Sequence, residues 1–142
     1  MTIARLIEGR STHIESCGMN TLVSDAIDIL ATKRIGAMPV MDGSAIAGIF
    51  SERDLVLRIN EFGPSMLDMP VGRVMTSPAI TVEPATAVLD ALALMTRRRI
   101  RHLPVLSGGR MVAFVSIGDL VKYRIDRIQH EADAMREYIQ TA

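Results

Sequence analysis

The pattern of apolar and polar positions predicts a unit of secondary structure that occurs twice along the chain. Apolar residues at helical spacing begin at Val23, and Thr21 stands before them as a candidate N-cap. Because this spacing places the apolar residues on one side of a helix, that side should be buried. The other predicted elements are a brief strand at residues 14–17, strands at residues 37–41 and 45–50 joined by an Asp-Gly-Ser turn, and a helix over residues 51–61 that ends at Phe62-Gly63-Pro64.

The second unit repeats the first at a constant offset of 65 positions, which relates Pro39 to Pro104 and Asp54 to Asp119. The apolar face of the first helix is conserved in character even where residues differ. Units of this size rarely bury their apolar faces alone, so the two halves should pack against each other. We therefore expect an α+β fold, an α/β sandwich in which two β-α-β-β-α repeats form a pseudo-twofold disc.

The segments around the two units complete the expected domain organisation. Apolar positions predict a short leading helix over residues 2–8, and residues 71–75 mirror it ahead of the second unit. Residues 63–72 are expected to form a loop. The predicted divisions are a first repeat with its leading helix (1–62), a linker (63–73), a second repeat (74–125) and a C-terminal helical extension (126–142).

The last helix is predicted to run from residue 119 to residue 140, about 30 Å, which is longer than a repeat needs. Its apolar residues alternate four and three positions apart in a heptad-like stripe. We expect this stripe to meet a second subunit, and the alternative is that the helix folds back over its own disc. The stripe consists of Val121, Ile125, Ile128, Ala132, Met135 and Ile139.

Composition limits the classes of function that the chain can have. Its 142 residues are 49% hydrophobic, and its 16 basic and 16 acidic residues cancel, so no overall charge favours nucleic acid or an anionic membrane. No apolar run is long enough to span a membrane, and the first ten residues lack the apolar stretch of a secretory signal. The single cysteine, Cys17, agrees with a reducing compartment, and we expect a cytoplasmic protein.

The candidate chemistry lies in a Ser-x-x-Asp motif present in both units, Ser51 to Asp54 and Ser116 to Asp119. Each motif stands where a predicted strand passes into a helix. The first backbone N–H groups of a helix have no internal partner and attract anions such as phosphate. The same pattern is close to a capping box, which stabilises a helix by about 1 kcal/mol without any ligand. Both interpretations stay open for each copy.

The residues that flank these motifs resemble the tandem CBS domain pair, also called a Bateman module, in its stand-alone form. The resemblance covers nearly the whole chain and implies a non-enzymatic regulatory protein that binds adenine nucleotides, AMP, ADP, ATP or NAD, between the repeats. No catalytic cofactor or metal is implied, and a homodimer through the disc faces and the C-terminal helix is expected. The residues that carry the resemblance are 35–40 with 48–55, 100–105 with 113–120, and Val74-Met75-Thr76.

By this resemblance, Asp54 and Asp119 bind ribose. An ionised carboxylate only accepts hydrogen bonds and has two oxygens, so one aspartate can take both neighbouring ribose hydroxyls. Ser51 and Ser116 can then serve a phosphate or a ribose oxygen.

The phosphate side is expected to differ between the two sites. The resemblance assigns Arg101 and His102 to phosphate in the second unit, where the first has Gly36 and Ala37, and Arg53 can compensate nearby.

Aliphatic residues should hold the base, because aromatic residues make up only 4% of the chain. In the second motif Ala113 replaces the glycine of the family pattern, and we expect its methyl group to narrow the approach of a ligand. The residues that match the adenine-side positions are Thr76, Ala79, Ile80, Leu103 and Pro104 around one cleft, and Ser11, Ile14, Met38 and Pro39 around the other.

Two other functions remain as alternatives. The chain can be an interaction scaffold in which both motifs are helix caps. The basic cluster at residues 97–102 allows nucleic-acid binding, although its position at a predicted helix end favours a solvated terminus for Arg97 to Arg99. An enzyme is disfavoured, since the sequence has neither a phosphate loop with lysine nor histidines and cysteines at metal-ligand spacing.

Overall fold

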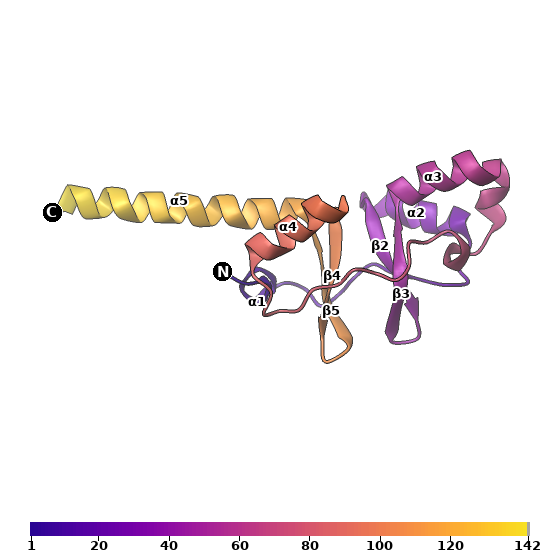
Figure 1. The fold of residues 1–142 in the computed structure, drawn as a ribbon, viewed down its shortest axis with the longest axis horizontal. Coiled ribbons are helices and arrows are strands. Elements are labelled where there is room, and N and C mark those ends of the chain that lie inside the picture. Colours follow the sequence, from indigo (N-terminus) through magenta and orange to yellow (C-terminus); the bar gives the residue numbers. More distant parts are fainter. Residues whose placement is uncertain (142) are drawn as a thin grey trace.

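The computed structural model describes residues 1–141 and has the two-part architecture shown in Figure 1. In chain order its elements are α1 (Ile3–Ile7), β1 (Cys17–Gly18), α2 (Val23–Lys33), β2 (Ala37–Asp42), β3 (Ala45–Ser51), α3 (Glu52–Phe62), the 3-10 helices η1 (Gly63–Asp68) and η2 (Val71–Arg73), α4 (Val88–Arg98), β4 (His102–Ser107), β5 (Arg110–Ser116) and α5 (Ile117–Thr141).

The two repeats have the same backbone plan. Each contains an antiparallel hairpin, β2 with β3 and β4 with β5, and each hairpin has a register shift at the same position, after Val40 and after Val105. The strand β1 adds to the first hairpin in parallel, whereas a single bridge from Val82 to Val105 replaces it in the second. Figure 1 shows the two hairpins side by side, with helices packed on each. The expected α+β pair of repeats is confirmed.

Each repeat has its own hydrophobic core, and each core is closed by the segment that precedes the other repeat. Ile3 of α1 is fully buried among the residues of the second repeat, and its N–H donates to the carbonyl of Thr86 at 2.9 Å. In the first repeat the corresponding cover comes from Val71 and Val74, both fully buried. The leading helix therefore crosses over to the second repeat, where Figure 1 shows it beside β5.

Three local predictions are wrong. The strand expected at residues 14–17 covers only Cys17–Gly18. The N-cap of α2 is Leu22, because the hydroxyl of Thr21 instead accepts a hydrogen bond from the N–H of Gly18 at 3.1 Å. Residues 63–72, expected as a loop, are mostly 3-10 helix, and Met66 within them is fully buried in the first core. The apolar side chain of Met66 anchors these turns, because it packs in the core of the first repeat.

The long terminal helix is confirmed as α5, which extends away from the disc in Figure 1. Its first turns pack on the second repeat through the fully buried Leu120, but every residue from Ile125 to Thr141 is exposed. The alternative in which α5 folds back over its own disc is therefore excluded. Within residues 1–141, none of the helices combines the length and the apolar character that a membrane span requires.

Candidate functional site

The first Ser-x-x-Asp motif forms a capping box at the start of α3. The N–H of Ser51 donates to Oδ2 of Asp54 at 2.9 Å, and the N–H of Asp54 donates to Oγ of Ser51 at 3.3 Å. The second carboxylate oxygen, Oδ1, accepts the hydroxyl of Thr76 at 2.6 Å. Asp54 is only 5% exposed, so the cap and the Thr76 contact together fix a buried carboxylate at the joint between β3 and α3.

The second motif has the same cap but a different partner on its outer oxygen. The N–H of Ser116 donates to Oδ2 of Asp119 at 2.8 Å, while the guanidinium of Arg10 lies 3.0 Å from Oδ1. Burial alone would raise the pKa of Asp119, but the hydrogen bonds from Ser116 and Arg10 outweigh it and hold that pKa below its ordinary value. An arginine of the same chain therefore occupies the side of Asp119 that a ribose would need.

The two motifs differ at one position of the adjoining strand, which is Gly48 in β3 and Ala113 in β5. A Cβ added to Gly48 would lie 2.6 Å from the carbonyl oxygen of Thr76, and only glycine leaves room for the bridge between Ile49 and Thr76. This bridge holds the Thr76 hydroxyl over Asp54. Ala113 occupies the equivalent position in β5, and there the corresponding segment carries Arg10 to Asp119. That the methyl group of Ala113 narrows the approach of a ligand stays a prediction.

Asp54 opens into a cavity of about 1010 Å³ between the two repeats. This volume is enough for a nucleotide. The first repeat contributes the end of β3 and the start of α3, and the second contributes the end of α4, the start of β4 and the segment from Thr76 to Ile80. Its lining includes the predicted site residues Ser51, Arg53, Asp54, Thr76, Ala79, Ile80, Arg101 and His102.

One side of this cavity carries a concentration of positive charge. Four arginines line it, Arg53, Arg98, Arg99 and Arg101, against the carboxylates of Glu52 and Asp54. Arg53 is oriented across the gap between the repeats, because its guanidinium donates to the carbonyl of Arg99 at 2.9 Å. Guanidinium groups suit the geometry of phosphate oxygens, so this side of the cavity is suited to phosphate.

His102 lies at the inner end of the arginine cluster, at the start of β4. Its ring stacks on Phe114 with the ring centres 5.5 Å apart. Burial lowers the pKa of His102, and the nearby carboxylates of Asp119 and Glu52 oppose that effect only in part. The imidazole is therefore mostly neutral at pH 7 and can donate one hydrogen bond to a phosphate oxygen.

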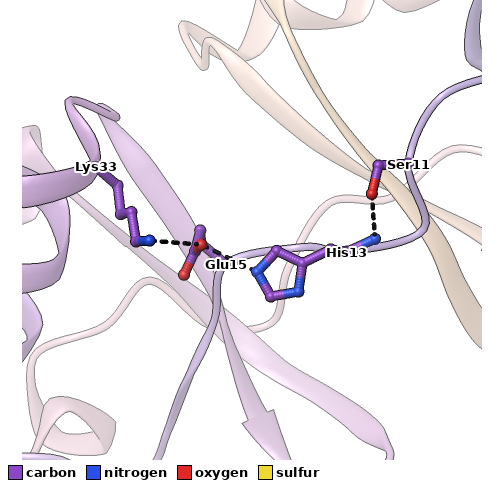
Figure 2. Close-up of polar contacts among 4 residues, drawn as sticks. All are labelled: Ser11, His13, Glu15 and Lys33. Carbon is purple, nitrogen blue, oxygen red and sulfur yellow. Dashed lines mark hydrogen bonds and ion pairs between the residues drawn. The ribbon is translucent and has the colours of Figure 1, made fainter.

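A second cavity of about 360 Å³ lies between the N-terminal segment and β5. The predicted residues Ser11 and Ile14 line it, together with Arg10 and Glu15. Figure 2 shows Glu15 between His13 at 3.0 Å and Lys33 at 3.5 Å, and the His13 contact is the main cause that holds the pKa of Glu15 below its ordinary value. An acidic side chain and an arginine already paired with Asp119 make this cavity less suited to phosphate than the larger one.

Four predicted adenine-side residues lie in the interior of the repeats. Met38 and Leu103 are fully buried and belong to the cores of the first and second repeat. Pro39 and Pro104 are also buried, within β2 and β4. None of the four lines either cavity, and their pattern in the sequence is equally typical of core and of lining.

Sequence reasoning missed several residues of the larger cavity. Arg98 and Arg99 were assigned to a solvated helix end, yet both line the cavity while remaining exposed. Arg99 has a left-handed backbone with φ of 54°, as does its counterpart Arg34 in the first repeat, so the chain turns sharply here after α4. The run of arginines in the sequence was the available signal for these lining residues. The direction in which their side chains point depends on this turn, which the sequence alone does not reveal. Leu57, Thr96 and Ile100 are among the other lining residues that the sequence did not indicate.

Within residues 1–141 there is no group of three or more His, Cys, Asp or Glu side chains placed to hold a metal ion. The side chains gathered around the larger cavity instead suit a ligand with hydroxyl groups at one end and anionic groups at the other.

Comparisons with known proteins show what this chain is similar to. The chain is 38% identical over 129 residues to the mitochondrial CBS domain-containing protein CBSX3 of Arabidopsis thaliana, a match that covers 87% of this chain and 63% of that protein. A solved protein with CBS domains from Burkholderia ambifaria MC40-6 has a TM-score of 0.83 and 40% identity, over 89% of this chain and 95% of that one. CBSX2, solved in complex with AMP, has a TM-score of 0.75 and 25% identity, over 88% and 96% of the two chains.

The family model of the CBS domain matches the sequence at residues 10–61 and again at residues 71–126. The two matched segments coincide with the two repeats of the structure, and together they cover more than half of the chain. The chain therefore belongs to the CBS domain family, as a tandem pair of CBS repeats.

Proposed function

We propose that this protein is a non-catalytic regulatory module that binds an adenine nucleotide in the larger cavity and passes the occupancy of that cavity to a partner. AMP, ADP and ATP are the candidate ligands, and NAD is a further one. The observation that carries the proposal is the placement of Asp54: a buried carboxylate opens into a nucleotide-sized cavity that four arginines also line.

In the proposed complex, Asp54 accepts the ribose hydroxyls and displaces the Thr76 hydroxyl, which now occupies Oδ1. The base lies against Ala79 and Ile80, and the phosphates lie toward the arginines and His102. The related protein CBSX2 has been solved in complex with AMP, which consists of an adenine base, a ribose and a phosphate. That complex supports an adenosine ligand for this cavity.

Occupancy can be transmitted because both repeats contribute to the cavity. Arg53 of the first repeat already contacts the carbonyl of Arg99 in the second, so a phosphate that binds both would fix the relative position of α3 and α4. These helices also carry exposed apolar residues, Val56 and Leu89 among them, on which a second copy can pack. We propose a homodimer through these disc faces. A cytoplasmic location stays a prediction.

The proposal is tested by isothermal titration of the protein with AMP, ADP, ATP and NAD, using Asp54→Asn and Asp119→Asn as a matched pair. Both substitutions keep a side-chain oxygen for the helix cap and remove the charge. We expect Asp54→Asn to weaken binding by about tenfold or more, since charge-assisted bonds to ribose are lost. Asp119→Asn should leave this affinity nearly unchanged, because that carboxylate is held by Arg10.

Absence of heat with every nucleotide at millimolar concentration, with the protein folded, would reject nucleotide binding and favour the interaction scaffold. Nucleic-acid binding has less support, because Arg98, Arg99 and Arg101 line a cavity between repeats. A gel shift that weakens with salt and disappears when Arg97 to Arg99 are neutralised would favour it instead.

A further inference from the structure

The outer part of α5 exposes an apolar stripe that nothing in the described chain covers. Five large apolar residues of the stripe are exposed. Their exposed fractions are 42% for Val121, 59% for Ile125, 48% for Ile128, 60% for Met135 and 67% for Ile139. We propose that α5 pairs with α5 of a second copy of this chain, parallel and in register, as a short coiled coil. This pairing is independent of the nucleotide site.

The first argument is that the stripe has the spacing of a coiled-coil seam. Positions 121, 128 and 135 fall at one core position of the heptad, and positions 125, 132 and 139 fall at the other. Such spacing keeps the seam facing one partner helix along its whole length. Most of the stability of a helix in a protein comes from packing its apolar face, so a helix that projects into solvent gains stability when a partner covers that face.

The second argument is that the stripe is free to meet a partner. In the first turns of α5 the residues that face the disc are Ile117, Leu120 and Tyr123. At about 100° per residue, the centre of the stripe lies roughly a quarter turn or slightly more around the helix from these residues. A partner helix can therefore lie along the stripe without displacing the disc on which the first turns of α5 pack.

Charges beside the stripe decide the orientation. In a parallel pair, Glu131 of one helix lies across the seam from Arg136 of the other, and symmetry repeats this attraction. In an antiparallel pair with the same layers, Glu131 would face its own copy and Lys122 would face Arg136. Arg136 is available for the parallel contact, because its present contact with Asp133 is 4.0 Å long and highly exposed. Like charges at these positions disfavour the antiparallel arrangement.

The first test compares two alanines on the same helix by sedimentation of the full chain over a range of concentrations. Ala132→Glu places a charge in the seam, and Ala134→Glu places the same charge outside it. We expect Ala132→Glu to weaken self-association by about tenfold or more, because burying a charge at the interface is costly. Ala134→Glu should associate like the wild type. A monomeric wild type, or equal behaviour of the two variants, would overturn the proposal.

The second test determines orientation by disulfide formation. Ile139→Cys places two thiols face to face only in a parallel, in-register pair, whereas Glu137→Cys places them on the outer face of either pair. The native Cys17 does not interfere, because it is buried and burial raises its pKa to about 11. Rapid crosslinking of Ile139→Cys relative to Glu137→Cys is the expected result. Equal rates for the two variants would contradict parallel pairing.

Discussion

Gly48 and Ala113 occupy the same position in the two repeats, and their side chains differ by one methyl group. At the scale of single residues this difference separates the two motifs. Gly48 lets the segment at Thr76 lie directly on β3, where its hydroxyl reaches Asp54. The second motif has Ala113 in place of this glycine, and Arg10 contacts its aspartate, Asp119, instead.

Gly48→Ala should therefore disturb both stability and binding. Its new methyl group would lie 2.6 Å from the backbone carbonyl oxygen of Thr76 and 2.8 Å from Sδ of Met75, and the backbone atom has little freedom to adjust. We expect the free energy of unfolding to fall by about 1–3 kcal/mol, measured by urea denaturation. The reverse change, Ala113→Gly, serves as the control and should cost about 1 kcal/mol or less.

His102 should contribute to the pH dependence of stability. Because burial lowers its pKa in the folded protein, the unfolded chain binds a proton at His102 more readily than the folded one does. Stability is then fully present above about pH 6.5, the ordinary pKa of histidine, and is lost as the pH falls through and below that value. Urea denaturation between pH 7.5 and about 5 should show this loss.

The contribution is isolated by His102→Gln, which should show a shallower fall in stability over this pH range than the wild type. His130→Gln changes an exposed histidine on α5 and should retain the wild-type slope. If both variants keep the same slope as the wild type, His102 does not carry this part of the pH dependence.

At the scale of elements, α1 is a short helix near the start of the sequence that completes the core of the more distant repeat. Ile3 is fully buried there, and the N–H of Ala4 donates to the carbonyl of Pro84 at 2.8 Å. We expect Ile3→Ala to lower the free energy of unfolding by about 2–5 kcal/mol, as for other buried isoleucines. Arg5→Ala removes only an exposed pair and should change it by about 0.5 kcal/mol or less. Thermal and urea denaturation would check both values.

The sequence predicted the hairpins, the helices and the starts of α3 and α5 well, because apolar spacing and the Ser-x-x-Asp caps are local signals. It could not predict the exchange of leading segments, since an apolar turn such as residues 3–7 carries no information about which core it enters. Thr21 was misassigned for a similar reason. A hydroxyl group just before a helix can either cap that helix or accept a hydrogen bond within the preceding turn. The Thr21 hydroxyl accepts one from the N–H of Gly18.

At the scale of the whole molecule, the sequence predicts two clefts that differ on the phosphate side, and the structure has a cavity of about 1010 Å³ and another of about 360 Å³. Asp54, Arg101 and His102 come together in the larger cleft although they lie in different repeats. The resemblance to the tandem CBS domain pair predicted these three residues. The pairing of Arg10 with Asp119 depends on side-chain packing across the disc, which residue spacing does not encode.

The number of nucleotides bound per chain should depend on Arg10. In the wild type we expect one binding event, at the Asp54 cavity, because Arg10 occupies the outer oxygen of Asp119. Arg10→Ala frees that oxygen, and isothermal titration should then detect a second, weaker event. Adding Asp119→Asn to Arg10→Ala should remove the second event again. A single event in Arg10→Ala with the first site intact would show that Arg10 does not limit the second site.

The crossing of α1 also has a consequence for biosynthesis. Ile3 leaves the ribosome before any of the side chains that bury it, which all lie in the second repeat. The first repeat has its buried core residues once Val74 has emerged, whereas the core of the second repeat also includes Ile3, which precedes it by the length of the first repeat. Ile3 therefore cannot reach its final packing until the residues of the second repeat, up to Leu120, have also been made.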